Sequence, residues 1–75
     1  MTTLSLSFSP ARLRAARKAA DLQVEHVAIA IGRSSFAVRE YERGRVTPPT
    51  QILGPLAAAV GCTIADLFEE CGGRG

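Results

Sequence analysis

Several classes of protein are excluded by what this sequence lacks. It has no tryptophan, one histidine and only two cysteines in 75 residues. Cys62 and Cys71 match no zinc or redox spacing and make a poor disulfide framework, so a reducing compartment fits them. The sequence contains no phosphate-binding glycine loop and no cluster of metal ligands, so we expect neither cofactor nor metal. The single histidine, His26, has no serine or cysteine placed to use it, which argues against an enzyme.

A long hydrophobic run is also missing. The longest nearly uncharged stretch, Val46–Ala65, contains Pro48, Pro49 and Pro55, which argues against a membrane span. The first ten residues lack the basic leader and apolar stretch of a signal peptide. We therefore expect a cytoplasmic protein without a membrane partner.

Charge of neither sign dominates, but the two signs are separated along the chain. The formal net charge is +2, and every basic residue except Arg74 lies before Val46. Asp66, Glu69 and Glu70 lie near the far end. This distribution suits orientation toward a polyanion, although a solvated surface would look the same, so charge alone does not decide between them.

Length, periodicity and capping residues predict one small, all-α domain. With 47% hydrophobic residues the chain is globular, and so small a core rarely supplies more than ~3–5 kcal/mol, so a partner subunit is expected. Helical spacing and the caps Ser9, Ser34 and Thr63 predict a compact bundle of about five short helices. The expected helices cover residues 10–20, 23–31, 35–43, 52–60 and 64–69. Gly54-Pro55 predicts that the fourth helix either kinks or effectively begins near Pro55.

The first residues have a different period. Thr3 to Ser9 alternates Leu4, Leu6 and Phe8 with serines, which is typical of a strand. An otherwise helical chain offers this strand no partner, so it is either a disordered arm or pairs with another copy. The expected organisation is an N-terminal arm at 1–8, a helical domain at 9–70 and a disordered tail at 71–75.

The stretch between residues 22 and 48 is the most informative. Two short helices are joined by the turn Gly32-Arg33-Ser34, and the second helix carries arginines, which is the layout of a helix-turn-helix. A protruding helix of this length fits the major groove of DNA. Double-stranded DNA is therefore the expected partner.

A set of residues spread from Leu13 to Phe68 matches a known pattern in one register. The matching residues are Leu13-Arg14-x-x-Arg17, Leu22, Val27-Ala28, Gly32, Ser34, Val38, Tyr41-Glu42-x-Gly44-Arg45-x-x-Pro48, Leu53-x-x-Leu56-Ala57-x-Ala59-x-Gly61 and Asp66-Leu67. In these positions the chain resembles the Cro/Xre, lambda-repressor-like helix-turn-helix family. The string from Tyr41 to Pro48 is the most specific part of the resemblance.

The resemblance implies that the start of the third helix faces the base edges. That selects Ser35, Phe36, Arg39 and Glu40 as candidate base-reading residues. Arg39 suits guanine O6 and N7, Glu40 a cytosine amino group, and Phe36 a thymine methyl group. Other roles stay open: Phe36 packed on a neighbour, Glu40 paired with Arg39 or Arg43, and Arg39 solvated or on a phosphate.

Candidate phosphate contacts surround that helix. They are Arg33 in the turn, Ser34 at the helix cap, Arg43 and Arg45 around the following loop, and Gln23 near the start of the second helix. The chain departs from the family at this last point, where Gln23-Val24 replaces the usual Thr-Gln. It also carries Arg33 where the family has an apolar residue.

One charged pair is expected to be structural. Glu42 lies among the inward residues of the third helix, where an unpaired carboxylate is costly. The family pairs this glutamate with an arginine late in the first helix, which here is Arg17. A structural role for both residues is favoured over a DNA contact.

These features predict a transcriptional regulator. We expect a repressor that binds a pseudo-palindromic operator as a homodimer, with one helix in each of two successive major grooves. The alternative is an antitoxin or another protein-interaction module on the same fold, with a toxin or regulator as partner. The residues proposed for the dimer interface are Ile64, Leu67 and Phe68, together with Leu4 and Leu6 of the arm.

Overall fold

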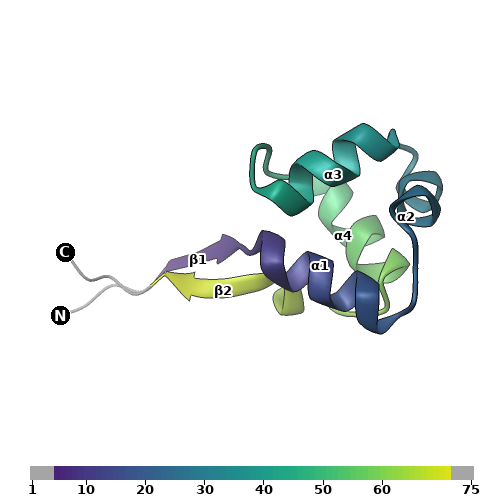
Figure 1. The fold of residues 1–75 in the computed structure, drawn as a ribbon. Helices are drawn as coiled ribbons and strands as arrows, with labels where there is room; N and C mark the ends of the chain where they lie inside the picture. Colours follow the sequence, from purple (N-terminus) through teal and green to yellow (C-terminus); the bar gives the residue numbers. More distant parts are fainter. Residues whose placement is uncertain (1–4, 72–75) are drawn as a thin grey trace, which may run out of the picture.

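Residues 5–71 are described by a computed structural model, with helices at the centre of the chain and a strand at each end (Figure 1). Strand β1 covers Ser5–Phe8 and β2 covers Phe68–Cys71. The helices between them are α1 (Pro10–Ala19), α2 (Val24–Ile31), α3 (Ser35–Arg43), α4 (Thr50–Ala59) and the 3-10 helix η1 (Ala65–Leu67). The predicted bundle of short helices with a strand-like N-terminal segment is confirmed.

Local signals set the ends of the first three helices. The Ser9 hydroxyl accepts a hydrogen bond from the Arg12 backbone N–H at 3.2 Å, and the Ser34 hydroxyl accepts one from Ala37 at 3.1 Å. Each bond satisfies a backbone donor that the first turn of a helix leaves free. Gly32 and Gly44 end α2 and α3 with φ of 70° and 78°. In this conformation a residue that carries a side chain is strained, whereas glycine is not.

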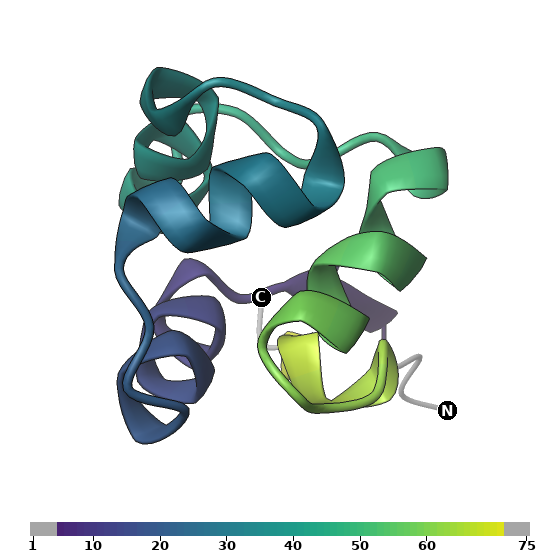
Figure 2. The ribbon, with the colours of Figure 1, turned by 90° about the vertical axis from the view of Figure 1, so that its right-hand side faces the viewer.

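All of these helices contribute to one core. Its buried members are Leu13, Val27, Ala28, Ile31, Val38, Tyr41, Ile52, Leu56, Ala57, Val60 and Leu67. In Figure 2, α1 lies at the lower left, below α2 and α3, and α4 runs down the right-hand side of the molecule beside them. This arrangement holds α2 and α3 together against a common support and fixes the angle between them.

The N-terminal strand pairs with the C-terminal end of the same chain, which corrects both earlier alternatives for this segment. β1 and β2 are antiparallel, with Ser5 opposite Cys71 and Phe8 opposite Phe68. The rings of Phe8 and Phe68 meet edge to face with centroids 6.2 Å apart. Cys71, expected to begin a tail, is the last residue of β2.

The predicted helix at 64–69 is correspondingly wrong. The chain forms only the three-residue helix η1 and then becomes extended, with φ −114° and ψ 152° at Phe68. An isolated helix of six residues does not offset the cost of its nucleation, whereas an extended strand gains the partner β1. Arg12 strengthens this choice, because its Nη1 donates to the Phe68 carbonyl at 2.8 Å.

Helix α4 begins earlier than Pro55. It starts at Thr50 and carries Pro55 inside, so of the two alternatives for this helix, a kink or a start near Pro55, the second is wrong. Ile52, Leu56 and Ala57 are buried by this helix, and their burial offsets the backbone hydrogen bond that proline cannot donate.

Candidate nucleic-acid interface

Helix α3 presents one face to the core and the other to solvent. Val38 is fully buried and Tyr41 nearly so, and both point toward the core from α3. Ala28 on α2 and Ala37 on α3 are small residues in the interior between the two helices, where a larger side chain would force them apart. The outer face of α3 is therefore held rigidly and is free to meet a partner.

The four candidate base-reading residues all lie on α3 but differ in their exposure to solvent. Phe36 is 68% exposed, so it does not pack in the core. Ser35 is half-buried at the start of α3. Glu40 is mostly covered, and its Oε2 lies 3.5 Å from Nη1 of Arg43, one helical turn further on. Of the two pairings considered for Glu40, the one with Arg43 is present.

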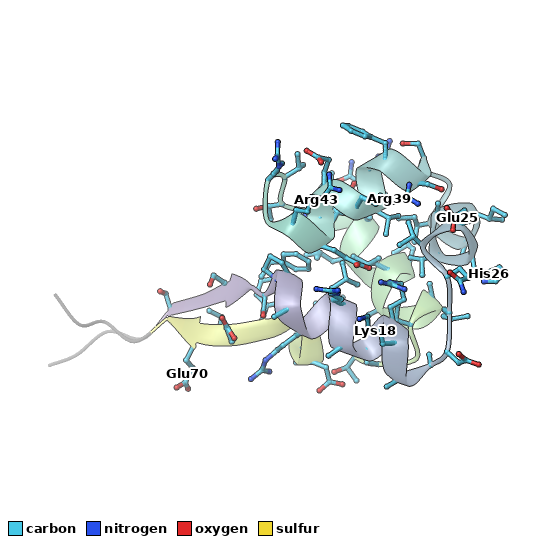
Figure 3. The ribbon with its side chains drawn as sticks, viewed as in Figure 1. Lys18, Glu25, His26, Arg39, Arg43 and Glu70 are labelled. Carbon is cyan, nitrogen blue, oxygen red and sulfur yellow. The ribbon has the colours of Figure 1, made fainter. Side chains whose placement is uncertain are left out.

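Arg39 has a partner on the neighbouring helix. Its Nη2 lies 2.9 Å from Oε2 of Glu25 in the first turn of α2, and both side chains remain about half exposed. Figure 3 shows the two side chains facing each other across the space between α2 and α3. A hydrogen bond from its own backbone N–H, followed by the one from Arg39, lowers the pKa of Glu25, so its carboxylate is charged at neutral pH.

The candidate phosphate contacts lie around the edges of the helix-turn-helix. Gln23 precedes α2, Arg33 and Ser34 form the turn, and Arg43 and Arg45 flank Gly44 at the end of α3. All five are exposed. The Ser34 hydroxyl is already used in the cap of α3, which leaves its backbone N–H to meet a phosphate.

Arg17 and Glu42 form a two-point ion pair between α1 and α3. Arg17 Nε donates to Glu42 Oε2 at 2.6 Å and its Nη2 donates to Oε1 at 3.1 Å. The third bond, from Nη1 to the Leu22 carbonyl at 2.9 Å, ties the same arginine to the start of α2. The hydrogen bond to Glu42 raises the pKa of Arg17, partly opposed by burial, so the arginine stays charged.

Beside this pair lies a basic hollow of about 290 Å³. It is lined by Arg14, Arg17, Val24, Arg39, Glu42 and Arg43, which come from α1, α2 and α3. Lys18 of α1 extends the basic surface below α3 in Figure 3. The hollow thus adds positive potential next to the exposed face of α3.

Three residues have roles at this surface that the sequence did not predict. Arg14 lines the hollow, Glu25 holds Arg39, and His26 caps α2. The His26 Nδ1 accepts a hydrogen bond from the Gln23 backbone N–H at 3.2 Å, which is the half of a capping box in which the third helical residue reaches back to the cap residue. The capping role had a signal, since His26 is the third residue of α2; the pairing of Glu25 had none.

The residues expected at a dimer interface separate into different environments. Leu6 is 64% and Ile64 45% exposed, whereas Leu67 is fully buried in the core. The assignment of Leu67 to an interface is therefore corrected, because a partner subunit has no surface of it to contact. Phe68 is half-buried against Phe8, and Leu4 lies outside the described residues.

Between residues 5 and 71, no three His, Cys, Asp or Glu side chains gather as metal ligands would. No helix in the same range has the length and apolar character needed to cross a membrane.

Comparisons with known proteins identify the fold. Residues 11–70 match a family model described as a helix-turn-helix domain. No curated protein sequence matches the chain.

Three solved structures are similar to this one. The P22 c2 repressor in complex with a synthetic operator shares 26% identity, with a TM-score of 0.75 over 81% of this chain and 92% of that one. The restriction-modification controller protein C.AhdI from Aeromonas hydrophila shares 30% identity, with a TM-score of 0.74 over 79% of this chain and 89% of that one. The clp gene regulator ClgR from Corynebacterium glutamicum shares 29% identity, with a TM-score of 0.74 over 77% of this chain and 62% of that one.

One of these similar proteins is a repressor bound to an operator, and the other two are a gene regulator and a restriction-modification controller protein. The match of the family model runs from the second residue of α1 to beyond the end of η1, so it covers all but one residue of the helical part of the structure. This chain belongs to the helix-turn-helix domain family, with the fold of the Cro/Xre, lambda-repressor-like DNA-binding regulators.

Proposed function

We propose that this chain is a sequence-specific transcriptional regulator, a repressor that binds a pseudo-palindromic operator as a homodimer. The observation that carries the proposal is the orientation of α3. Val38 and Tyr41 anchor one face in the core, while Phe36 and Arg39 project from the other. A helix fixed in this way fits the major groove, and the arginines at its edges complement the phosphates on either side.

Its relatives support this mode of action. The P22 c2 repressor, a similar structure at 26% identity, has been seen bound to a synthetic operator. In this chain Ser35, Phe36, Arg39 and Glu40 would read bases, and Gln23, Arg33, Ser34, Arg43 and Arg45 would hold phosphates. Occlusion of a promoter by the bound protein is the outcome we propose for binding.

Selection of duplexes by the purified protein tests the proposal. Random and genomic fragments are incubated with the protein at 50 and at about 150 mM salt, near the physiological ionic strength, and the bound fraction is sequenced. We expect an inverted repeat that is enriched at both salt concentrations, with half-sites ~34 Å apart. Unselective binding that collapses at the higher salt concentration would contradict it.

A second candidate is an antitoxin or another protein-interaction module. The observation in its favour is Ile29 on α2, an isoleucine that is 80% exposed. A partner protein that covered this side chain would remove its apolar surface from water. Co-expression with the product of an adjacent toxin-like reading frame tests this function: a stable complex that Ile29→Glu abolishes supports it, and no complex excludes that partner.

A further inference from the structure

We propose that Glu25 is a positioning residue that aims the Arg39 guanidinium at a guanine edge and so sets one base preference of α3. The inference rests on the proposed function and deepens it. Glu25 lies on α2 and Arg39 on α3, fourteen residues apart in the chain, and a hydrogen bond of 2.9 Å joins them. Glu25 itself is not one of the residues expected to touch DNA.

The geometry leaves Arg39 able to make a two-point contact. Glu25 takes up Nη2 alone, and within residues 5–71 no protein acceptor is recorded for Nε or Nη1. An arginine carries five N–H donors in a rigid fork, so four remain after this bond is made. Two of them are enough for O6 and N7 of guanine.

The bond to Glu25 also lowers the free-energy cost of ordering the Arg39 side chain when DNA binds. An exposed arginine side chain samples many rotamers, and ordering it at an interface costs free energy. A partner on a second helix removes part of that cost before DNA arrives. Glu25 is well placed for this task, because it belongs to the first turn of α2, where the helix dipole favours an acidic side chain.

The same ion pair favours a base over a phosphate as the target of Arg39. The carboxylate of Glu25 cancels much of the arginine charge and repels an approaching phosphate. Guanine acceptors carry no net charge, so this repulsion is much weaker for them. Arg33 and Arg45 are exposed and have no recorded acidic partner among the described residues, so they suit phosphates better.

The experiment compares binding to the preferred duplex with binding to duplexes changed at one base pair. The proteins are wild type, Arg39→Ala, Glu25→Gln and the double variant Glu25→Gln/Arg39→Ala. A bidentate arginine contact to guanine discriminates roughly 5- to 140-fold against other bases. We expect Arg39→Ala to abolish that preference at one position and Glu25→Gln to reduce it at the same position, with no further loss in the double variant.

Asp21→Asn is the matched control. It also removes one negative charge from an exposed acidic residue, and asparagine tolerates the positive φ of 58° at this position. Both single charge removals should raise affinity for all duplexes slightly, because they reduce repulsion of phosphates. Only Glu25→Gln should change the ratio between guanine and the other bases.

Each outcome decides something. If Glu25→Gln binds all duplexes more tightly but keeps the guanine preference, Glu25 is only a surface charge and the inference is overturned, while the regulator proposal stands. If Arg39→Ala leaves every base preference intact, the inference is likewise overturned. If the wild-type protein prefers no base at any position, the inference and the proposed function both fail.

Discussion

Arg17 and Glu42 are the two charged side chains most closely tied to the core. Their side chains are only 12% and 9% exposed, and each satisfies the other with two hydrogen bonds. Removing one partner leaves a nearly buried charge unpaired, which typically costs about 3–5 kcal/mol. We therefore expect Arg17→Ala to lose most of the free energy of unfolding, measured by urea titration followed by circular dichroism.

A double variant separates the charge from the packing. Arg17→Met/Glu42→Leu keeps apolar volume at both positions and leaves no unpaired ion. It should be more stable than Arg17→Ala. If the double variant is instead as unstable as Arg17→Ala, Arg17 stabilises the fold mainly through its bond to the Leu22 carbonyl and not through the ion pair.

Arg45 tests the assignment of phosphate contacts. This residue follows Gly44 and is exposed, so Arg45→Ala should weaken binding to all duplexes alike and lower the slope of log affinity against log salt by about one. Arg12→Ala, which removes a charge held near Glu69 on β2, is the control and should leave the slope unchanged. A change in base preference with Arg45→Ala would contradict the assignment.

The candidate site could be predicted from sequence where its residues act locally. Ser9 and Ser34 cap helices within four residues of their own positions, and such patterns are visible in the chain. Glu42 and Arg17 were paired through the family resemblance. The bond between Glu25 and Arg39 could not be predicted, because it depends on the angle at which α2 meets α3.

At the scale of elements, the β1–β2 pair decides how the two ends of the chain are held. Ser9 N–H donates to the Leu67 carbonyl at 2.8 Å, and the rings of Phe8 and Phe68 meet at the base of the pair. Phe68→Leu keeps apolar bulk but removes the ring contact, so it should cost about 0.5–1.5 kcal/mol of unfolding free energy. Faster amide hydrogen exchange in β1 would accompany this loss.

The exposed ring of α3 supplies the control for that change. Phe36→Leu alters a side chain that is outside the core, so it should shift stability by less than about 0.5 kcal/mol. Equal destabilisation by the two substitutions would mean that the contact of Phe8 with Phe68 contributes nothing specific.

The turn before η1 contains a pH-sensitive cap. Thr63 N–H donates to Asp66 Oδ2 at 3.0 Å, and Asp66 N–H donates to the Thr63 hydroxyl at 3.2 Å. The hydrogen bonds from Thr63 lower the pKa of Asp66. A carboxyl group whose pKa is lowered by folding stabilises the folded state at any pH above its pKa in the unfolded chain, which is roughly 3.9 for aspartate. This stabilisation is lost as the pH falls through the lower pKa that the group has in the folded protein.

The consequence is a stability difference that depends on pH. Asp66→Ala should be less stable than wild type at pH 7, and the gap should narrow as the pH falls through the lowered pKa of Asp66. Thermal unfolding at pH 7, 4 and 2.5 measures it. A gap of constant size would show that the ionised carboxylate is not the source of the stabilisation.

The same segment marks the limit of prediction from local patterns. Thr63 was predicted to cap a helix over residues 64–69, and its hydroxyl accepts a hydrogen bond from the Asp66 N–H, but the helix lasts only from Ala65 to Leu67. The strand at Phe68 forms because β1, more than fifty residues earlier, offers its backbone groups. Sequence periodicity describes neighbours along the chain, so it detected β1 as a strand and missed its partner.

For the whole molecule, the helical core was predictable because buried residues recur at helical spacing. Leu13, Val38 and Leu56 are fully buried, as the spacing and the resemblance indicate. The burial of Leu67 could not be predicted, because the same apolar pattern fits both a core residue and an interface residue. Only the packing of η1 under the other helices distinguishes the two.

The assembly of two molecules is the remaining step from this domain to a paired operator site. Leu6 and Ile64 are the expected interface residues that stay exposed, so a lysine at either position would bring a charge into the interface. We expect Leu6→Lys and Ile64→Lys to shift the mass in analytical ultracentrifugation from dimer to monomer. Affinity for a full inverted repeat should then fall to that for one half-site. Ile29→Lys, a change at a still more exposed isoleucine outside this surface, should leave the dimer mass unchanged. A wild-type monomer that binds a half-site as tightly as a full site would contradict the dimer.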